Sequence, residues 1–240
     1  MFRFYFTILT SVFEYIYFMI RYNIIMRHPE RYTESERYSL AQFVVNNIRR
    51  KGNVCVRYSG LDNLPKDNGY ILYPNHQGRF DAVAIISCHK NPLTFVMDSI
   101  RSRVIVMDEI TTLLGGKRLN KSDIRNQVKT ILEVADEVAS GRNYIIFPEG
   151  GYATEVHDNE VHPFMAGAFK AAVKSKCPIV PVALIDSYKV YEKHSLKKVY
   201  CEVHYLPPIT YDEYKDMNTF EISDLVKSRI ESKIKEALAI

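Results

Sequence analysis

The stretch from Tyr70 to Cys88 reads YILYPNHQGRFDAVAIISC. It begins with a β-rich run, continues through a polar loop and ends in a segment with the apolar character of a helix. Further along, the runs 144–147 and 179–185 are almost entirely apolar, as strands are when both faces of a sheet are covered. This alternation predicts an α/β fold with a mixed, largely parallel sheet flanked by helices.

Short β-rich runs alternate with helical stretches from residue 53 onward. Because ligands of such sheets gather at the carboxyl ends of the strands, the residues that follow strands are the candidates for chemistry. The expected strands are 54–58, 70–74, 93–97, 144–147, 179–185 and 199–205. The expected helices are 81–88, 103–114, 121–140, 164–174 and 223–239.

The composition is that of a packed globular protein, with 47% hydrophobic and 25% charged residues among 240. The formal charge of +4 fits an anionic membrane surface or phosphate-bearing substrates and selects neither. The four cysteines have no C-x-x-C spacing, so we expect free thiols in a reducing, cytoplasmic compartment. The composition changes near residue 50, which divides the chain into an N-terminal segment, 1–52, and an α/β domain, 53–240.

The N-terminal segment has seventeen residues between Arg3 and Arg21 that are almost all bulky and apolar. The run is slightly shorter than the ~20 residues that span a bilayer, and it contains Glu14. We expect a helix that lies on the cytoplasmic face of a membrane, peripheral or monotopic, with Arg3, Arg21 and Arg27 near lipid phosphates. The alternative is a core helix whose polar stripe faces solvent. The stripe consists of Arg3, Thr7, Thr10, Ser11, Glu14 and Arg21.

A second helix is predicted over 33–50. Thr33 and Glu36 have the spacing of a capping box, and residues 49–52 supply three basic residues followed by a glycine. The basic end complements the helix dipole or contacts lipid phosphates, and the sequence leaves both readings open. The two helices together are the expected membrane-docking segment.

His76 and Asp81 stand five positions apart in the loop that follows the predicted strand 70–74. In a turn that bends into a helix, this spacing can bring the carboxylate to one ring nitrogen of the imidazole. The other ring nitrogen is then left to accept a proton. The competing interpretation makes Asp81 a helix N-cap and His76 an ordinary loop residue.

Glu149 follows the predicted strand 144–147 and is followed by Gly150 and Gly151. Glycine allows close approach of a ligand to the backbone, so we expect Glu149 to face the same crevice as His76. Taken alone, the sequence Pro-Glu-Gly-Gly also fits a polar turn.

Taken in order, several blocks resemble those of the glycerolipid acyltransferases, of the 1-acylglycerol-3-phosphate acyltransferase type. The resemblance covers residues 54 to about 190, and the ordered set is far more specific than any one block. It implies a glycerol-phosphate-acyltransferase-like fold, with no metal and no cofactor. The blocks are NHQGRFD at 75–81, GKRLNK at 116–121, FPEG at 147–150, PFMAGAFK at 163–170 and VPV at 180–182.

The resemblance also implies a reaction. His76, oriented by Asp81, removes the proton of an acceptor hydroxyl, which attacks the thioester of acyl carrier protein (acyl-ACP) or coenzyme A (acyl-CoA). The acceptor is a lysophospholipid, 1-acylglycerol 3-phosphate, and the product is phosphatidate. The implied substrate-binding residues are Asn75, Arg79, Arg118, Lys121, Glu149 and Gly150.

Two positions put the acceptor in question. Lys121 ends the phosphate block as a point charge, without the bidentate fork of arginine. FPEG is commonly followed by Thr-Arg-Ser in the family, whereas this chain has Gly-Tyr-Ala at 151–153, so one cation is missing. Another lysolipid or a small alcohol is therefore an alternative acceptor. A catalytically silent lipid-binding protein with this fold is the alternative from another class.

Two other groups of residues invite different functions. Four residues whose side chains can bind a metal occur within six positions. Their spacing fits no common metal site, and we interpret them as part of an exposed loop. The lysines and tyrosines of 188–200 lack a recognition helix or an aromatic platform, so we expect no nucleic-acid partner. The four possible ligands are His157, Asp158, Glu160 and His162.

Overall fold

The computed structural model describes residues 2–100, 102, 106–151, 158–192 and 195–239. The strands in these ranges form a seven-stranded sheet in the order β1-β7-β6-β2-β5-β3-β4. Neighbouring strands are parallel except β6 and β7, which are antiparallel. The predicted mixed, largely parallel sheet is therefore confirmed. The strands are β1 (Val54–Ser59), β2 (Ile71–Pro74), β3 (Thr94–Asp98), β4 (Lys117–Leu119), β5 (Tyr144–Ile145), β6 (Ile179–Ile185) and β7 (Val199–Tyr205).

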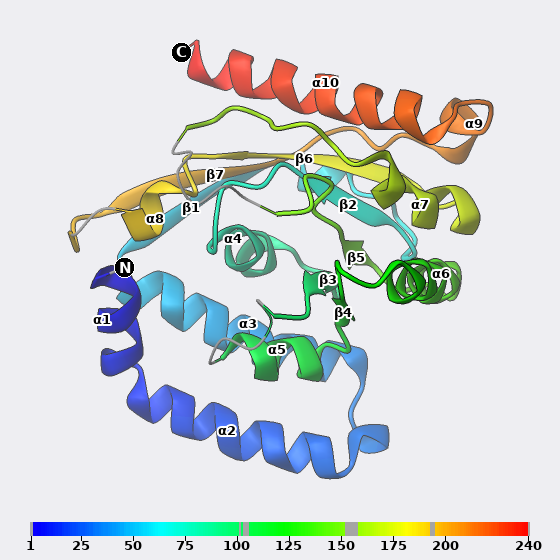
Figure 1. The fold of residues 1–240 in the computed structure, drawn as a ribbon. Helices are drawn as coiled ribbons and strands as arrows, with labels where there is room; N and C mark the ends of the chain where they lie inside the picture. The colour runs from blue at the N-terminus through cyan, green and yellow to red at the C-terminus, as the bar shows by residue number, and fades with distance from the viewer. Residues whose placement is uncertain (1, 101, 103–105, 152–157, 193–194, 240) are drawn as a thin grey trace.

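Helices cover both faces of the sheet (Figure 1). They are α1 (Phe2–Thr10), α2 (Val12–Arg27), α3 (Glu34–Lys51), α4 (Asp81–Cys88), α5 (Met107–Leu113), α6 (Ile124–Ala139), α7 (Lys170–Ser175), α8 (Lys189–Glu192), α9 (Tyr211–Tyr214) and α10 (Thr219–Leu238). Along β2, Leu72 belongs to a hydrophobic cluster shared with α3, α4 and α5, whereas Ile71 belongs to one shared with α6, α7 and α10. The alternation buries both faces of β2.

Most of the predicted elements of the α/β domain are present, with shifted ends. The predicted helix 164–174 is a short 3₁₀ helix, η4 (Ala166–Phe169), continued by α7. Of the predicted helix 103–114, α5 is described and residues 103–105 lie outside the described residues. The sequence analysis missed β4, α8 and α9, because three or four residues are too few to show a periodicity.

Residues 2–52 contain three α-helices and a short 3₁₀ helix, η1 (Pro29–Arg31), where two helices were predicted. The predicted first helix is divided at Ser11 into α1 and α2. Lys51, the last residue of α3, holds this break together: its ammonium donates to the Thr10 carbonyl at the end of α1 and pairs with Glu14 of α2 at 2.7 Å. The hydrogen bond from Lys51 lowers the pKa of Glu14. Lys51 at the basic end of α3 therefore stabilises the junction between α1 and α2.

Two residues of the polar stripe on α1, Arg3 and Thr7, face the protein, whereas several apolar residues of α1 face outward. Arg3 is fully buried, and its guanidinium donates to the carbonyls of Gly52 and Lys197. Leu9, by contrast, is 74% exposed, and Phe13 on α2 is 85% exposed. The expected contact of Arg3 with lipid phosphates is wrong, because burial withdraws the guanidinium from any bilayer surface. The core helix with an exposed polar stripe is wrong as well.

The outward apolar residues of α1 and α2 form a surface that we call the N-terminal apolar face. It lies on the side of the molecule opposite α10 (Figure 1). An exposed apolar set of this size marks an interaction surface. Of the helices in the described ranges, none combines the length and apolar character that crossing a bilayer requires. The face consists of Phe2, Tyr5, Ile8, Leu9, Val12, Phe13, Ile16, Tyr17, Ile20 and Ile24.

The side chain of Asn75 ties the loop after β2 to β6. The ladder between the two strands runs as far as Pro74 and Val182. Beyond it, Asn75 Nδ2 donates to the Leu184 carbonyl at 3.0 Å, and Asn75 Oδ1 accepts from the Leu184 N–H at 2.7 Å. The fully buried amide thus prolongs the ladder by one rung and fixes the start of the His76 loop.

Replacing Asn75 by alanine is expected to lower the free energy of unfolding by about 2–4 kcal/mol, since a buried N–H and a buried C=O lose their partners. Urea denaturation measures the change. The matched control is Asn23→Ala, whose exposed amide donates within α2, and a change within ~0.5 kcal/mol is expected there. Equal stability of the two variants would contradict the role given to Asn75.

Candidate active site

The candidate site lies at one edge of the sheet. Because β2, β3, β4, β5 and β6 are mutually parallel, their carboxyl ends emerge along this edge. His76 follows β2, Glu149 follows β5 and Ser187 follows β6. Asp81 joins them as the first residue of α4. Three segments far apart in the sequence therefore supply one site: the loop from His76 to Asp81, the turn with Glu149 and the loop with Ser187.

The predicted contact between Asp81 and one ring nitrogen of His76 is confirmed. His76 Nδ1 lies 2.6 Å from Asp81 Oδ2. The same oxygen accepts the backbone N–H groups of Gln77 at 2.6 Å and Gly78 at 2.9 Å. The carboxylate is fully buried at the start of α4, where the helix dipole favours negative charge. With Nδ1 donating to Asp81, Nε2 is the ring nitrogen that can accept a proton.

The ring of His76 is also held by packing. It stacks on Phe147 with centroids 4.1 Å apart and planes inclined by 27°. The backbone N–H of His76 donates to Glu149 Oε1 at 2.9 Å. The side chain retains 14% exposure, so the ring is fixed on several sides yet accessible to a substrate.

Glu149 lies next to His76 and is largely buried; its expected position in a crevice shared with His76 stays a prediction. Burial, with a smaller contribution from the charge of Asp81, raises the pKa of Glu149 to about 8. Its Oε2 is buried and has no hydrogen-bond partner among the described residues. The raised pKa favours the protonated form of this carboxyl group near neutral pH.

Gly150 has a φ of +70°, which favours glycine. A Cβ at this position would also lie 2.5 Å from Met165 Sδ. A side chain at position 150 would therefore both strain the backbone and displace Met165, so glycine allows the turn after Glu149 to pack against Met165.

The remaining predicted substrate residues are spread along the same edge. Asn75 is engaged by Leu184, so its side chain acts on the loop instead of facing a ligand. Arg79 is exposed in the His76 loop. Arg118 Nη2 donates to Asp108 Oδ1 at 2.6 Å, and Lys121 Nζ lies 3.6 Å from Asp98 Oδ2. β4 is three strands from β2, a spacing of ~14 Å, so the structure does not bring Arg118 and Lys121 against His76.

Two contacts of the site were missed by the sequence analysis. Phe147 belongs to the FPEG block but was not expected to stack on the imidazole. Ser187 contacts Asp81 from the loop after β6. The strand-end rule that selected His76 would also have selected Ser187, because it follows the apolar run 179–185 by two positions.

Other sequence features are placed away from this chemistry or outside the described residues. His157, Tyr152 and Ala153 lie outside the described residues. Within the ranges that are described, no three His, Cys, Asp or Glu residues are grouped as metal ligands. The four cysteines are free thiols, as expected.

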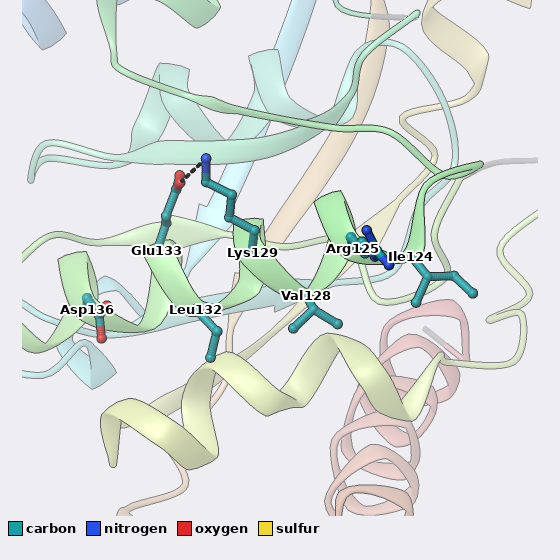
Figure 2. Close-up of a pocket in the computed structure, with 7 residues that line it drawn as sticks. All are labelled: Ile124, Arg125, Val128, Lys129, Leu132, Glu133 and Asp136. Carbon is teal, nitrogen blue, oxygen red and sulfur yellow. Dashed lines mark ion pairs between the residues drawn. The ribbon is translucent and has the colours of Figure 1, made fainter.

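A surface groove runs along α6 and contains none of the site residues (Figure 2). Val128 and Leu132 project from the same side of the helix, and Lys129 pairs with Glu133 at 3.8 Å. The groove is a feature of the helix surface and does not belong to the candidate active site.

Residues 55–185 match the family model named Acyltransferase. The chain belongs to this acyltransferase family. Its match with the 1-acyl-sn-glycerol-3-phosphate acyltransferase of Escherichia coli (strain K12) is 27% identical over 167 residues, 69% of this chain and 67% of that protein. The resemblance inferred from the motifs is thereby confirmed.

Other relatives of the acyltransferase family are longer than this chain. The enzyme of the same name from Chlamydomonas reinhardtii is 28% identical over 153 residues, 62% of this chain and 45% of that protein. The chloroplastic enzyme BAT2 of Brassica napus is 30% identical over 132 residues, 55% of this chain and 37% of that protein. The match thus spans less than half the length of these two relatives.

The fold itself matches a solved acyltransferase structure. That structure is the 1-acyl-sn-glycerophosphate acyltransferase PlsC from Thermotoga maritima, with a TM-score of 0.78 and 21% sequence identity. The superposition covers 99% of this chain and 94% of the other. The predicted glycerol-phosphate-acyltransferase-like fold is confirmed.

Replacing Glu149 by glutamine is expected to make stability less dependent on pH. The folded pKa of about 8 lies above the ~4.3 of an unfolded glutamate, so the unfolded state loses the proton first. The stability that the proton contributes is full below pH ~4 and is lost as the pH rises to about 8. Between pH 5 and 8.5, the wild-type Tm should fall relative to the Glu149→Gln Tm by at least ~2 °C.

The matched control for this measurement is Glu160→Gln, a substitution at an exposed glutamate. Its Tm should follow the wild-type Tm at both pH values. A constant difference between wild type and Glu149→Gln across the range would show that Glu149 does not hold its proton in the folded protein.

Proposed function

We propose that the protein transfers a fatty acyl group from an acyl thioester to the free hydroxyl of 1-acylglycerol 3-phosphate, forming phosphatidate. The observation that carries the proposal is the His76–Asp81 pair, hydrogen-bonded at 2.6 Å at the strand-end edge. Membership of the acyltransferase family supports the reaction type. The names of the relatives support the acceptor.

In the proposed mechanism His76 is a general base. Nε2 takes the proton of the acceptor hydroxyl as its oxygen forms a bond to the thioester carbonyl carbon. Asp81 stabilises the imidazolium, as carboxylates do in comparable dyads. When the tetrahedral intermediate collapses, the C–S bond breaks, and the imidazolium returns the proton to the leaving thiolate. Acyl-ACP and acyl-CoA both carry the thioester that these steps require.

Glu149 and Gly150 are proposed to position the glycerol part of the acceptor. The protonated Oε2 is buried near the loop of His76 and has a hydrogen bond to give. Gly150, with its positive φ, allows the sharp turn that follows Glu149 and its close packing on Met165. A hydrogen-bond donor that is already held in place in a site of low polarity can orient an oxygen atom of the lysolipid, because little has to reorganise when the lysolipid binds.

Arg79, exposed in the loop of His76, is proposed to hold the acceptor phosphate, whereas two other cations implied by the family resemblance, Arg118 and Lys121, lie at or beyond β4, ~14 Å from β2. The last two already pair with carboxylates, so a phosphate must replace Asp108 beside Arg118. That competition, with the missing cation after Gly151, supports a second candidate acceptor, a lysolipid or small alcohol without this phosphate. A purely lipid-binding role is less well supported, because it needs neither the His76–Asp81 contact nor the protonated Glu149.

Replacing His76 by alanine is expected to lower acyl transfer by ~10²–10⁴-fold, the usual contribution of a positioned imidazole base. The measurement is transfer of radiolabelled acyl groups in lipid micelles, with both donors and with lysophosphatidate, lysophosphatidylcholine and glycerol 3-phosphate as acceptors. The matched control is His204→Ala, since His204 bonds Ser59 and Glu202 on the outer strands. Wild-type turnover in His76→Ala would refute the mechanism.

We also propose that the N-terminal apolar face lies in the interfacial plane of a bilayer, on the cytoplasmic side. Its aliphatic and aromatic side chains suit the boundary between headgroups and acyl chains. Arg27, exposed at the end of α2, is placed to contact anionic headgroups. The three connected helices would then hold the catalytic domain close to acceptors that themselves reside in the membrane.

The double substitution Leu9→Glu/Phe13→Glu is expected to reduce sedimentation with phosphatidylglycerol-containing liposomes by at least ~10-fold, because two charges enter the apolar boundary. Phe220→Glu is the control, since Phe220 is 74% exposed and belongs to α10, a helix that lies on the opposite side of the molecule from α2 (Figure 1). Liposome binding by the double variant equal to that of the control would exclude the N-terminal apolar face as the docking surface.

A further inference from the structure

Asp81 has a second carboxylate oxygen, and its partner comes from a distant part of the chain. Oδ2 is used by His76, Gln77 and Gly78, whereas Oδ1 accepts a hydrogen bond from Ser187 Oγ. Ser187 is 1% exposed, and Asp81 is fully buried. The mechanism proposed above does not use this contact.

The proton of the Ser187 hydroxyl can be assigned from the groups around it. Ser187 Oγ lies 2.9 Å from Gln77 Oε1 as well, a neutral amide oxygen that also accepts the Ser187 backbone N–H at 2.9 Å. The other end of the same amide, Gln77 Nε2, donates to Asn159 Oδ1 at 2.7 Å, which sets the orientation of the amide. A hydroxyl has one proton, and the charged oxygen of Asp81 is the stronger acceptor.

The loop that carries Ser187 is held in place by further contacts. Asp186 adopts a φ of +62°, which is uncommon for a residue with a side chain. Asn159 holds this turn through Oδ1, which accepts the Asp186 N–H at 2.9 Å, and through Nδ2, which donates to Asp186 Oδ1 at 3.0 Å. Lys189 pairs with the other oxygen of Asp186 at 2.7 Å. A turn stabilised in this way presents Ser187 to Asp81 in one orientation.

We propose that Ser187 is a positioning residue of the His76–Asp81 pair, and that Gln77 and Asn159 hold Ser187 in that position. The torsion that rotates a carboxylate is soft, so a donor on Oδ1 keeps Oδ2 directed at His76 Nδ1. The hydrogen bond from Ser187 also withdraws part of the negative charge of Asp81. Asp81 therefore stabilises an imidazolium at His76 less strongly than it would without this hydrogen bond. The inference rests on the proposed function in one respect, since it takes His76 as the base.

The test is Ser187→Ala, with Ser87→Ala as the control, because Ser87 lies on the helix of Asp81 but donates to the Ala84 carbonyl. Ser187→Ala is expected to lower kcat by ~10- to 100-fold with little change in the KM for the acceptor, since misorientation of the base affects the reacting geometry. The acidic limb of the kcat/KM profile of Ser187→Ala should move to a pH that is higher by ~0.5–1 unit. Without the hydrogen bond from Ser187, Asp81 keeps more of its negative charge and favours the imidazolium.

A readout without turnover separates this inference from the proposed function. Proton NMR should show the His76 Nδ1–H resonance far downfield in the wild type and displaced in Ser187→Ala. If the wild type transfers no acyl group, the proposed function fails and the NMR comparison still decides the role of Ser187. Should Ser187→Ala not fold, Ser187→Cys keeps the shape with a weaker donor, and smaller changes in the same direction are expected.

Two results would overturn the role of Ser187. One is a kcat, a pH profile and an Nδ1–H resonance that all match the wild type. The other is a lower kcat in Ser187→Ala with the pH profile and the resonance unchanged, which would assign Ser187 a general structural role.

Discussion

A carboxylate removed from water must find donors for both of its oxygens, and the buried group of Asp81 finds them in two separate segments. The imidazole of His76 and two backbone N–H groups reach one oxygen, and the hydroxyl of Ser187 reaches the other. The site can form only when the loops after β2 and β6 lie side by side. Asn75 secures that arrangement, because its amide extends the hydrogen bonding between the same two strands. The pairing of β2 with β6 during folding therefore also brings together the residues that hold Asp81 and His76.

The two carboxyl groups near His76 have different environments. Asp81 is surrounded by donors, which suits a negative charge, whereas Glu149 has one backbone donor and an oxygen without a partner among the described residues. Burial raises the pKa of Glu149 to about 8, so it presents a proton where Asp81 presents charge. Two groups of opposite hydrogen-bonding character thus contact the same residue, Asp81 at the ring of His76 and Glu149 at its backbone N–H.

The N-terminal helices reverse the usual arrangement of an amphipathic helix on a soluble domain. Arg3 lies against the protein, and Leu9 and Phe13 lie outside. The polar stripe is used to attach α1 to the end of α3 and to the region before β7, where the guanidinium of Arg3 reaches two carbonyls. A segment attached by polar contacts leaves its apolar side for another partner. In our proposal that partner is the membrane that holds the acceptor lipid.

The α/β class, most strands and helices, the family, and the candidates His76, Asp81 and Glu149 can all be predicted from the amino-acid sequence. Local patterns suffice for these, because burial on two faces, capping boxes and strand-end motifs involve neighbouring residues. The fold was needed to show that Asn75 bonds Leu184, that Ser187 contacts Asp81, that Arg118 pairs with Asp108, and which side of α1 faces outward. The pairing of β2 with β6 creates the first two contacts, and the docking of α1 on α3 decides the last. No local pattern encodes such pairings, because they depend on which distant segments come together.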